Sequence, residues 1–178
     1  MTRKVALPSE PTRCEVSHVV LDGPSGNTWE QLLMEFAEHH RDVAAYVKND
    51  HLGFEIPYVH EGKAHVYVPD FLVRLKQRNG DLVRTLIVEV SGGQKRLVAP
   101  GLTDMKLAVA RDTWCVAVNN HGGFGRWGYL EITDPVTAKA DLDAAISQVY
   151  ADGPIVGSGD RADFHQRPEI GRWRSAAS

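Results

Sequence analysis

Two short segments decide the fold of this chain: VPDF at residues 68–71 and LIVEVS at residues 86–91. Both are rich in β-branched or aromatic residues, as strands are, and they fall in predicted strands over residues 64–75 and 82–90. Between them, Asn79-Gly80 is a type I′ turn signal, which predicts that the two strands pair antiparallel. Each predicted strand carries one acid in apolar surroundings, Asp70 in the first and Glu89 in the second.

Acids on two neighbouring strands form the geometry of a metal site. Two close carboxylates in an apolar sheet repel one another and lose hydration, and a hard cation such as Mg²⁺ relieves both costs. The alternation of side chains along a strand places Glu89 and Ser91 on one face. The sequence therefore predicts a Mg²⁺ site, with Mn²⁺ as a substitute ion, whose ligands are Asp70, Glu89 and the carbonyl of Val90.

The remaining elements follow from local signals. Thr28 and Gln31 form a capping-box signal for a helix over residues 29–40, which has apolar residues at 3.6-residue spacing. Thr103 is the predicted cap of a helix from residue 104 to about 117, although residues 115–118 fit a strand equally well. Asp134-Pro135 is a start signal for a last helix ending near Tyr150. Further strands are predicted over residues 16–21, 43–47, 54–59 and 127–133, and a glycine-rich loop over residues 119–128.

Length and composition indicate one globular domain with two tails. The chain has 178 residues, 43% hydrophobic and 24% charged, which is enough for one core. We expect a flexible lead-in over residues 1–14, the domain over residues 15–152 and a disordered tail over residues 153–178. No apolar run approaches 18 residues and no signal peptide is evident, so we expect a soluble, cytoplasmic protein with no membrane partner. The two cysteines fit a reducing compartment.

The acids and their flanking residues resemble the core of PD-(D/E)XK nucleases, in which Pro-Asp at one strand precedes Glu-x-Lys at the end of the next. The resemblance extends to YVKND at 46–50, LGFEIPY at 52–58, VNN at 118–120 and FGRWG at 124–128. With these segments, residues 15–150 look like the nuclease domain at the end of type III restriction-enzyme cleavage subunits. The resemblance implies an α/β (α+β) fold with a restriction-endonuclease-like core: helix, three strands, helix, strand, with a mixed central sheet flanked by helices. The order of the predicted elements supports this core.

The function implied by the resemblance is that of a hydrolase, a divalent-metal-dependent endonuclease of the restriction type that cuts phosphodiester bonds in double-stranded DNA. The family's catalytic Lys is replaced here by Ser91. Two lysines are candidates to replace it: Lys106, predicted in the first turn of the helix after the glycine loop, and Lys95 in that loop. The alternative is a catalytically silent DNA-binding or assembly module that keeps the nuclease fold.

Two further predictions concern the surroundings of the site. Glu30 lies at the edge of the apolar face of the first helix, where it is either a catalytic acid or a first-turn Glu favoured by the helix dipole. Residues 63–126 hold ten bases against five acids, whereas residues 15–62 hold nine acids against two bases. A basic segment favours a phosphate backbone, and Lys95, Arg96 and Arg126 are the expected DNA contacts.

The expected partners are double-stranded DNA, a helicase or translocase subunit, a methyltransferase subunit of a restriction-modification system, and a second copy in a homodimer. No GxxxxGK[ST] motif occurs in the chain, so the ATP-driven motor of type III enzymes is absent from it. Whether the chain is a free-standing site-specific deoxyribonuclease or a fragment of a larger subunit is left open by the sequence.

Overall fold

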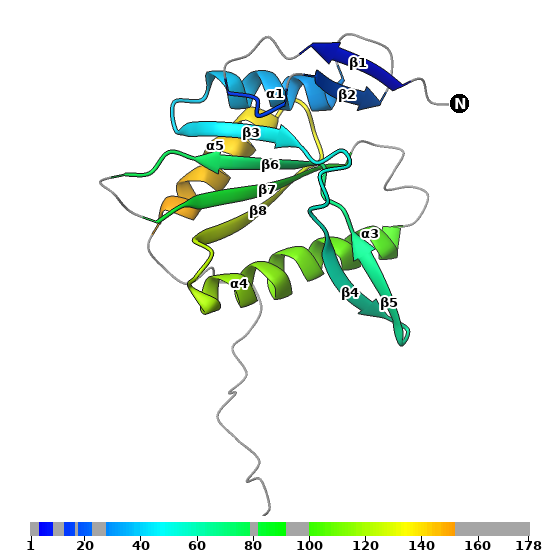
Figure 1. The fold of residues 1–178 in the computed structure, drawn as a ribbon. Coiled ribbons are helices and arrows are strands. Elements are labelled where there is room, and N and C mark those ends of the chain that lie inside the picture. Colours follow the sequence, from blue (N-terminus) through cyan, green and yellow to red (C-terminus); the bar gives the residue numbers. More distant parts are fainter. Residues whose placement is uncertain are drawn as a thin grey trace, which may run out of the picture.

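The computed structural model describes residues 4–8, 13–16, 18–22, 28–78, 82–91 and 100–151 (Figure 1). At its centre lies a four-stranded sheet in the order β3-β6-β7-β8. These strands are β3 Val43–Lys48, β6 Phe71–Leu75, β7 Arg84–Val90 and β8 Arg126–Ile132. β6 pairs antiparallel with β3 and β7, whereas β8 runs parallel to β7. Parallel neighbours need a crossover connection, and a helix supplies it here.

Helices cover both faces of this sheet (Figure 1). One face packs against α1 Trp29–His39 and α5 Ala138–Tyr150, with Leu33, Phe71, Val88 and Leu142 among the fully buried side chains. The other face packs against the crossover helix, which runs without interruption through α3 Pro100–Ala108, η1 Val109–Trp114 and α4 Cys115–His121. The described core elements therefore follow one another as helix, three strands, helix and strand. A mixed sheet between helices is confirmed.

Two small antiparallel sheets stand beside the central one. The hairpin of β4 Ile56–His60 and β5 Lys63–Tyr67 turns at Glu61 and Gly62, both of which have positive φ, 48° and 74°. β1 Lys4–Pro8 pairs with β2 His18–Asp22. The lead-in expected over residues 1–14 therefore contains a strand, because its backbone groups find hydrogen-bond partners on β2. The expected tail over residues 153–178 lies outside the described residues.

The single strand expected over residues 64–75 is in fact two strands in two sheets. β5 ends at Tyr67 and β6 begins at Phe71, so Asp70 lies where the chain crosses from one sheet to the other. Pro69 has no N–H for a ladder. The buried Asn49 holds the crossing, because its side-chain amide donates to the Pro69 carbonyl at 3.0 Å and its backbone N–H to the Asp70 carbonyl at 2.8 Å.

Two predicted helix starts are wrong, whereas the capping box of α1 is confirmed by both of its hydrogen bonds. The crossover helix begins at Pro100, so Thr103 lies inside it and is not its cap. Asp134 accepts a hydrogen bond from the Val136 N–H at 2.8 Å and so forms a turn, and α5 begins only at Ala138.

The crossover helix also extends beyond the predicted end near residue 117, to His121. Its middle, η1, is a π-helix, in which the Cys115 N–H donates to the carbonyl of Ala110 five residues earlier. Both residues are buried in the same cluster. The wide turn thus keeps two residues on one face that an α-helix would turn apart. Within the described residues no helix is long and apolar enough to span a membrane.

Candidate active site

Asp70 and Glu89 lie beside one another at one end of the central sheet. Phe71 of β6 is the register partner of Val88 of β7, so Asp70, one residue before Phe71, stands opposite Glu89. The Asp70 Oδ2 accepts a hydrogen bond from the Val90 N–H at 2.8 Å. The acids expected on neighbouring strands are therefore adjacent, although Asp70 lies in the crossing and not within β6.

A further acid lies on the next strand beside Glu89, and it was not among the predicted site residues. Glu131 of β8 is the register partner of Glu89 of β7. Side chains of parallel partners project from the same face, and this is the face of Ile87, which packs toward the crossover helix. The sequence predicts a strand that contains Glu131. Only the pairing of β7 with β8, however, shows that this acid stands beside Glu89.

The buried Tyr67 and the half-buried Tyr129 complete the site. The hydroxyl of Tyr67, on β5, donates to Glu89 Oε2 at 2.7 Å and lies 3.3 Å from the hydroxyl of Tyr129 on β8. Burial raises the pKa of the Tyr67 phenol well above its ordinary value, and the charge of Glu89 adds to this effect. Burial also raises the pKa of Tyr129; its hydrogen bond with Tyr67 opposes the shift, and the charges of Glu89, Glu131 and Asp70 add to it. Both phenols therefore remain protonated near neutral pH.

The structure places Glu30 elsewhere. Its carboxylate forms an ion pair of 2.7 Å with the ammonium of Lys48, and both side chains are only 11% exposed. Lys48 is the register partner of Phe71, which packs in the cluster under α1 and α5. The sheet therefore separates Glu30 from the face that carries Glu89.

The candidate cations are less closely tied to the acids. Lys106 lies half-buried in the last turn of α3 and not in a first turn as predicted, because the helix begins already at Pro100. Its ammonium makes no hydrogen bond or ion pair within the part of the chain that the structure describes. Lys95 and Arg96 lie outside the described residues. Arg126 opens β8, five residues before Glu131, which is about 16 Å along a strand. Its predicted DNA contact thus belongs to the opposite end of the sheet from the acids.

Position 91 is enclosed. Ser91 is only 3% exposed. Its backbone N–H donates a hydrogen bond to the Ile132 carbonyl at 3.0 Å, which continues the parallel ladder beyond Val90. The Ser hydroxyl can hold a water but carries no positive charge. The end of β7 therefore supplies oxygen atoms that could bind a metal ion, but no positively charged side chain.

The oxygens of the site suit a hard divalent ion. Among the described residues, no three His, Cys, Asp or Glu side chains gather in a way that could hold a metal. Mg²⁺, however, keeps several waters and binds through one or two carboxylates. Asp70, Glu89 and the Val90 carbonyl fit that pattern. Comparison with known proteins gives no match to this chain among family models, curated proteins or solved structures.

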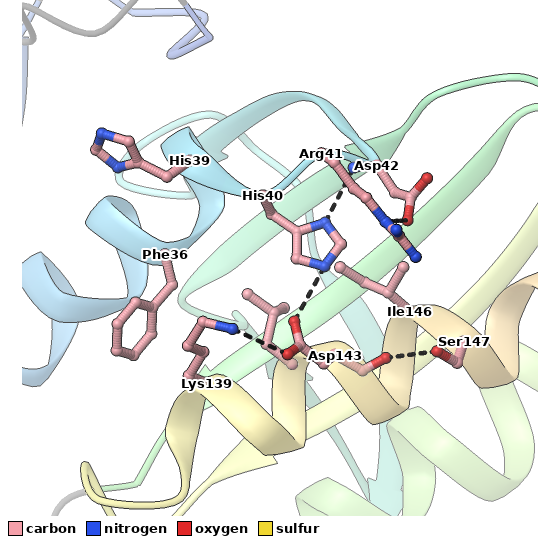
Figure 2. A pocket seen from close by; sticks show the side chains of 10 residues that line it. Phe36, His39, His40, Arg41, Asp42, Lys139, Asp143, Ile146 and Ser147 are labelled. Carbon is pink, nitrogen blue, oxygen red and sulfur yellow. Dashed lines mark hydrogen bonds and ion pairs between the residues drawn. The ribbon is translucent and has the colours of Figure 1, made fainter.

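A separate cleft of about 410 Å³ lies between the end of α1 and α5 (Figure 2). His40 stands in it with both ring nitrogens engaged: Nε2 lies 3.0 Å from Asp143, and Nδ1 accepts the Asp42 N–H at 3.0 Å. Lys139 also binds Asp143, at 3.1 Å. The contact between His40 and Asp143 therefore joins the end of α1 to α5, and the polar groups in this cleft already bind one another.

Proposed function

We propose that the chain is a Mg²⁺-dependent endonuclease domain of the restriction type, with a restriction-endonuclease-like fold, that hydrolyses phosphodiester bonds of double-stranded DNA. The observation that carries this proposal is that Asp70 and Glu89 stand opposite one another on one face of the sheet. The N–H of Val90, the residue after Glu89, donates a hydrogen bond to Asp70 at 2.8 Å. The order of helix, three strands, helix and strand in the core supports it.

The residues of the site have distinct tasks in this proposal. The Val90 N–H fixes the carboxylate of Asp70 through Oδ2 and so orients this ligand for the ion. Glu89, whose Oε2 accepts a hydrogen bond from Tyr67, would be the second carboxylate ligand. When bound, the ion lowers the pKa of its water and stabilises negative charge on the phosphate. Orientation of the attacking water falls to a lysine from outside β7, and Lys106 is our first candidate.

A second function, a catalytically silent DNA-binding module, is favoured by Ser91. This residue is buried at the place where the resemblance to PD-(D/E)XK nucleases expects Lys. Loss of that ammonium removes a positive charge from beside the reacting phosphate, which commonly costs about a hundredfold or more in rate. The fold and the acids can persist without it.

Plasmid cleavage in Mg²⁺, Mn²⁺ and chelator tests the proposal with two isosteric variants. Asp70→Asn keeps an acceptor for the Val90 N–H, which an Ala would leave unbonded, and Glu89→Gln keeps an acceptor for Tyr67. We expect cleavage to fall by about a hundredfold or more in each. Glu35→Gln, at an exposed position of α1, is the control and should cleave like the parent. Full activity in both site variants would exclude this active site.

Ser91→Lys separates the two functions. If the natural protein cleaves and Lys106→Ala reduces the rate about a hundredfold, a lysine from α3 serves the site. If the natural protein does not cleave, and Ser91→Lys creates metal-dependent cleavage, the silent module is the correct function. Binding of DNA at low salt without cleavage in either protein supports the silent module as well.

A further inference from the structure

Tyr129, Tyr67 and Glu89 form a directed chain of hydrogen bonds. A phenol has one hydrogen to donate, and at 2.7 Å from Oε2 the hydrogen of Tyr67 is given to the Glu89 carboxylate. The contact of 3.3 Å between the two phenol oxygens must then be filled by the hydrogen of Tyr129. Donation therefore runs from Tyr129 through Tyr67 to Glu89.

The three residues come from three different strands. Tyr67 ends β5 of the small hairpin, Glu89 lies in β7, and Tyr129 lies in β8. Tyr67 is only 4% exposed, so water cannot readily take its place as a donor. Tyr67 also precedes Asp70 by only three residues, so one short segment supplies both an acid of the pair and the hydrogen-bond donor to the other acid.

We propose that Tyr67, supported by Tyr129, positions Glu89 for a divalent cation. This inference rests on the proposed function. A Glu side chain without such a partner must lose rotamer freedom when it binds an ion, whereas the Tyr67 hydroxyl already holds Glu89 through Oε2. Partners that orient a metal ligand commonly contribute 10–100-fold to metal affinity, and Tyr67 occupies that place. Both tyrosines are thus positioning residues, which would act on the ion through Glu89.

Calorimetric titration of the full chain with Mn²⁺ tests this role. Tyr67→Phe removes only the hydroxyl and should weaken Mn²⁺ binding by about 10–100-fold. Tyr129→Phe should weaken it less, because Tyr67 keeps its bond to Glu89. The matched control is Tyr58→Phe: Tyr58 is buried in the same cluster, and its hydroxyl makes no hydrogen bond within the described residues. Its Mn²⁺ affinity should equal that of the parent.

The outcomes separate this inference from the proposed function. If Glu89→Gln abolishes Mn²⁺ binding while a folded Tyr67→Phe binds like the parent, the positioning role is excluded and the metal site stands. If the parent binds no Mn²⁺, or Glu89→Gln binds as the parent does, both are excluded. An equal loss in Tyr58→Phe would also overturn the role, because it would trace the effect to a loosened core. Should Tyr67→Phe not fold, unchanged affinity in a folded Tyr129→Phe would exclude the chain of donors.

Discussion

At the scale of single residues, Glu30 and Lys48 form an enclosed ion pair, in which each side chain is only 11% exposed. Removing one partner of a buried pair leaves an uncompensated charge and commonly costs about 3–5 kcal/mol, whereas replacing both with apolar residues is often neutral. We therefore expect Lys48→Met to lower the free energy of unfolding by about 3 kcal/mol, and Glu30→Leu with Lys48→Met to recover much of it. Urea denaturation measures both.

The same variants test whether Glu30 serves the site. If Glu30 serves only to form the ion pair with Lys48, the folded double variant Glu30→Leu, Lys48→Met should bind Mn²⁺ like the parent. The reason is that the sheet lies between Glu30 and Glu89. A loss of Mn²⁺ affinity in that protein would support the predicted catalytic role of Glu30.

Asp42 gives a prediction about pH. Burial alone would raise its pKa, but hydrogen bonds and charges from Arg78 and Arg41, at 3.2 and 3.3 Å, outweigh burial and lower the pKa below 3.8. A lowered folded-state pKa stabilises the protein above 3.8, and this stabilisation is lost as pH falls through the folded value. Asp42→Asn should therefore cost at most about 1 kcal/mol at neutral pH, since Arg78 is 52% exposed. The cost should vanish in acid; urea unfolding that shows one pH-independent difference would contradict this.

The residues of the site could be predicted only in part. Asp70 and Glu89 stood out because each is an acid within an apolar run. Tyr67 and Tyr129 did not, because a Tyr in a strand is ordinarily a core residue. Glu131 lies some forty residues from Glu89 in sequence, and only long-range pairing makes them neighbours.

At the scale of elements, local signals decided which predictions succeeded. The capping box of α1 is written in four consecutive residues and was read correctly. The break between β5 and β6 depends on Asn49, twenty residues before Pro69. The sequences on both sides of the break are similarly typical of strands, so they do not show where one strand ends and the next begins. The π turn escaped prediction because it departs from 3.6-residue spacing, on which helix prediction rests.

The contact between β8 and α5 depends on Gly128. A Cβ at this position would collide with the Cγ2 of Val149 on α5 and would lie 3.3 Å from Leu86 Cδ1. Overpacking of this kind commonly costs about 1–3 kcal/mol, so Gly128→Ala should lower the melting temperature. Val149→Ala alone leaves a cavity, and the two changes together should cost less than their sum. Strict additivity in thermal unfolding would show that the two residues do not share this space.

At the scale of the whole molecule, the charge is net −3 but unevenly distributed, and residues 63–126 hold twice as many bases as acids. We expect modest DNA affinity whose logarithm falls with the logarithm of salt, by roughly 0.9 per neutralised phosphate. Arg126→Ala should reduce that slope by about one if this residue contacts phosphate. Fluorescence anisotropy over a salt series measures both. An unchanged slope would remove Arg126 from the DNA contacts, and affinity independent of salt would contradict the basic surface altogether.

The order of the core elements was predictable, whereas the division into sheets was not. Helix, three strands, helix and strand follow from the sequence because each element has its own periodicity. The assignment of β4 and β5 to a separate hairpin depends on how chain crossings and buried polar groups are satisfied in three dimensions, and a linear pattern does not contain that information.

The position of β7 between β6 and β8 has a consequence for local unfolding. Leu86, Ile87 and Val88 are fully buried, and β7 has a hydrogen-bonded neighbour on each side. Strands of this kind open last in hydrogen exchange, often only with the whole protein. Glu89 is carried by this strand, whereas Asp70 belongs to the junction between two sheets. A cation between them would tie the slowest-exchanging strand to that junction, so its binding would slow amide exchange mainly on the Asp70 side.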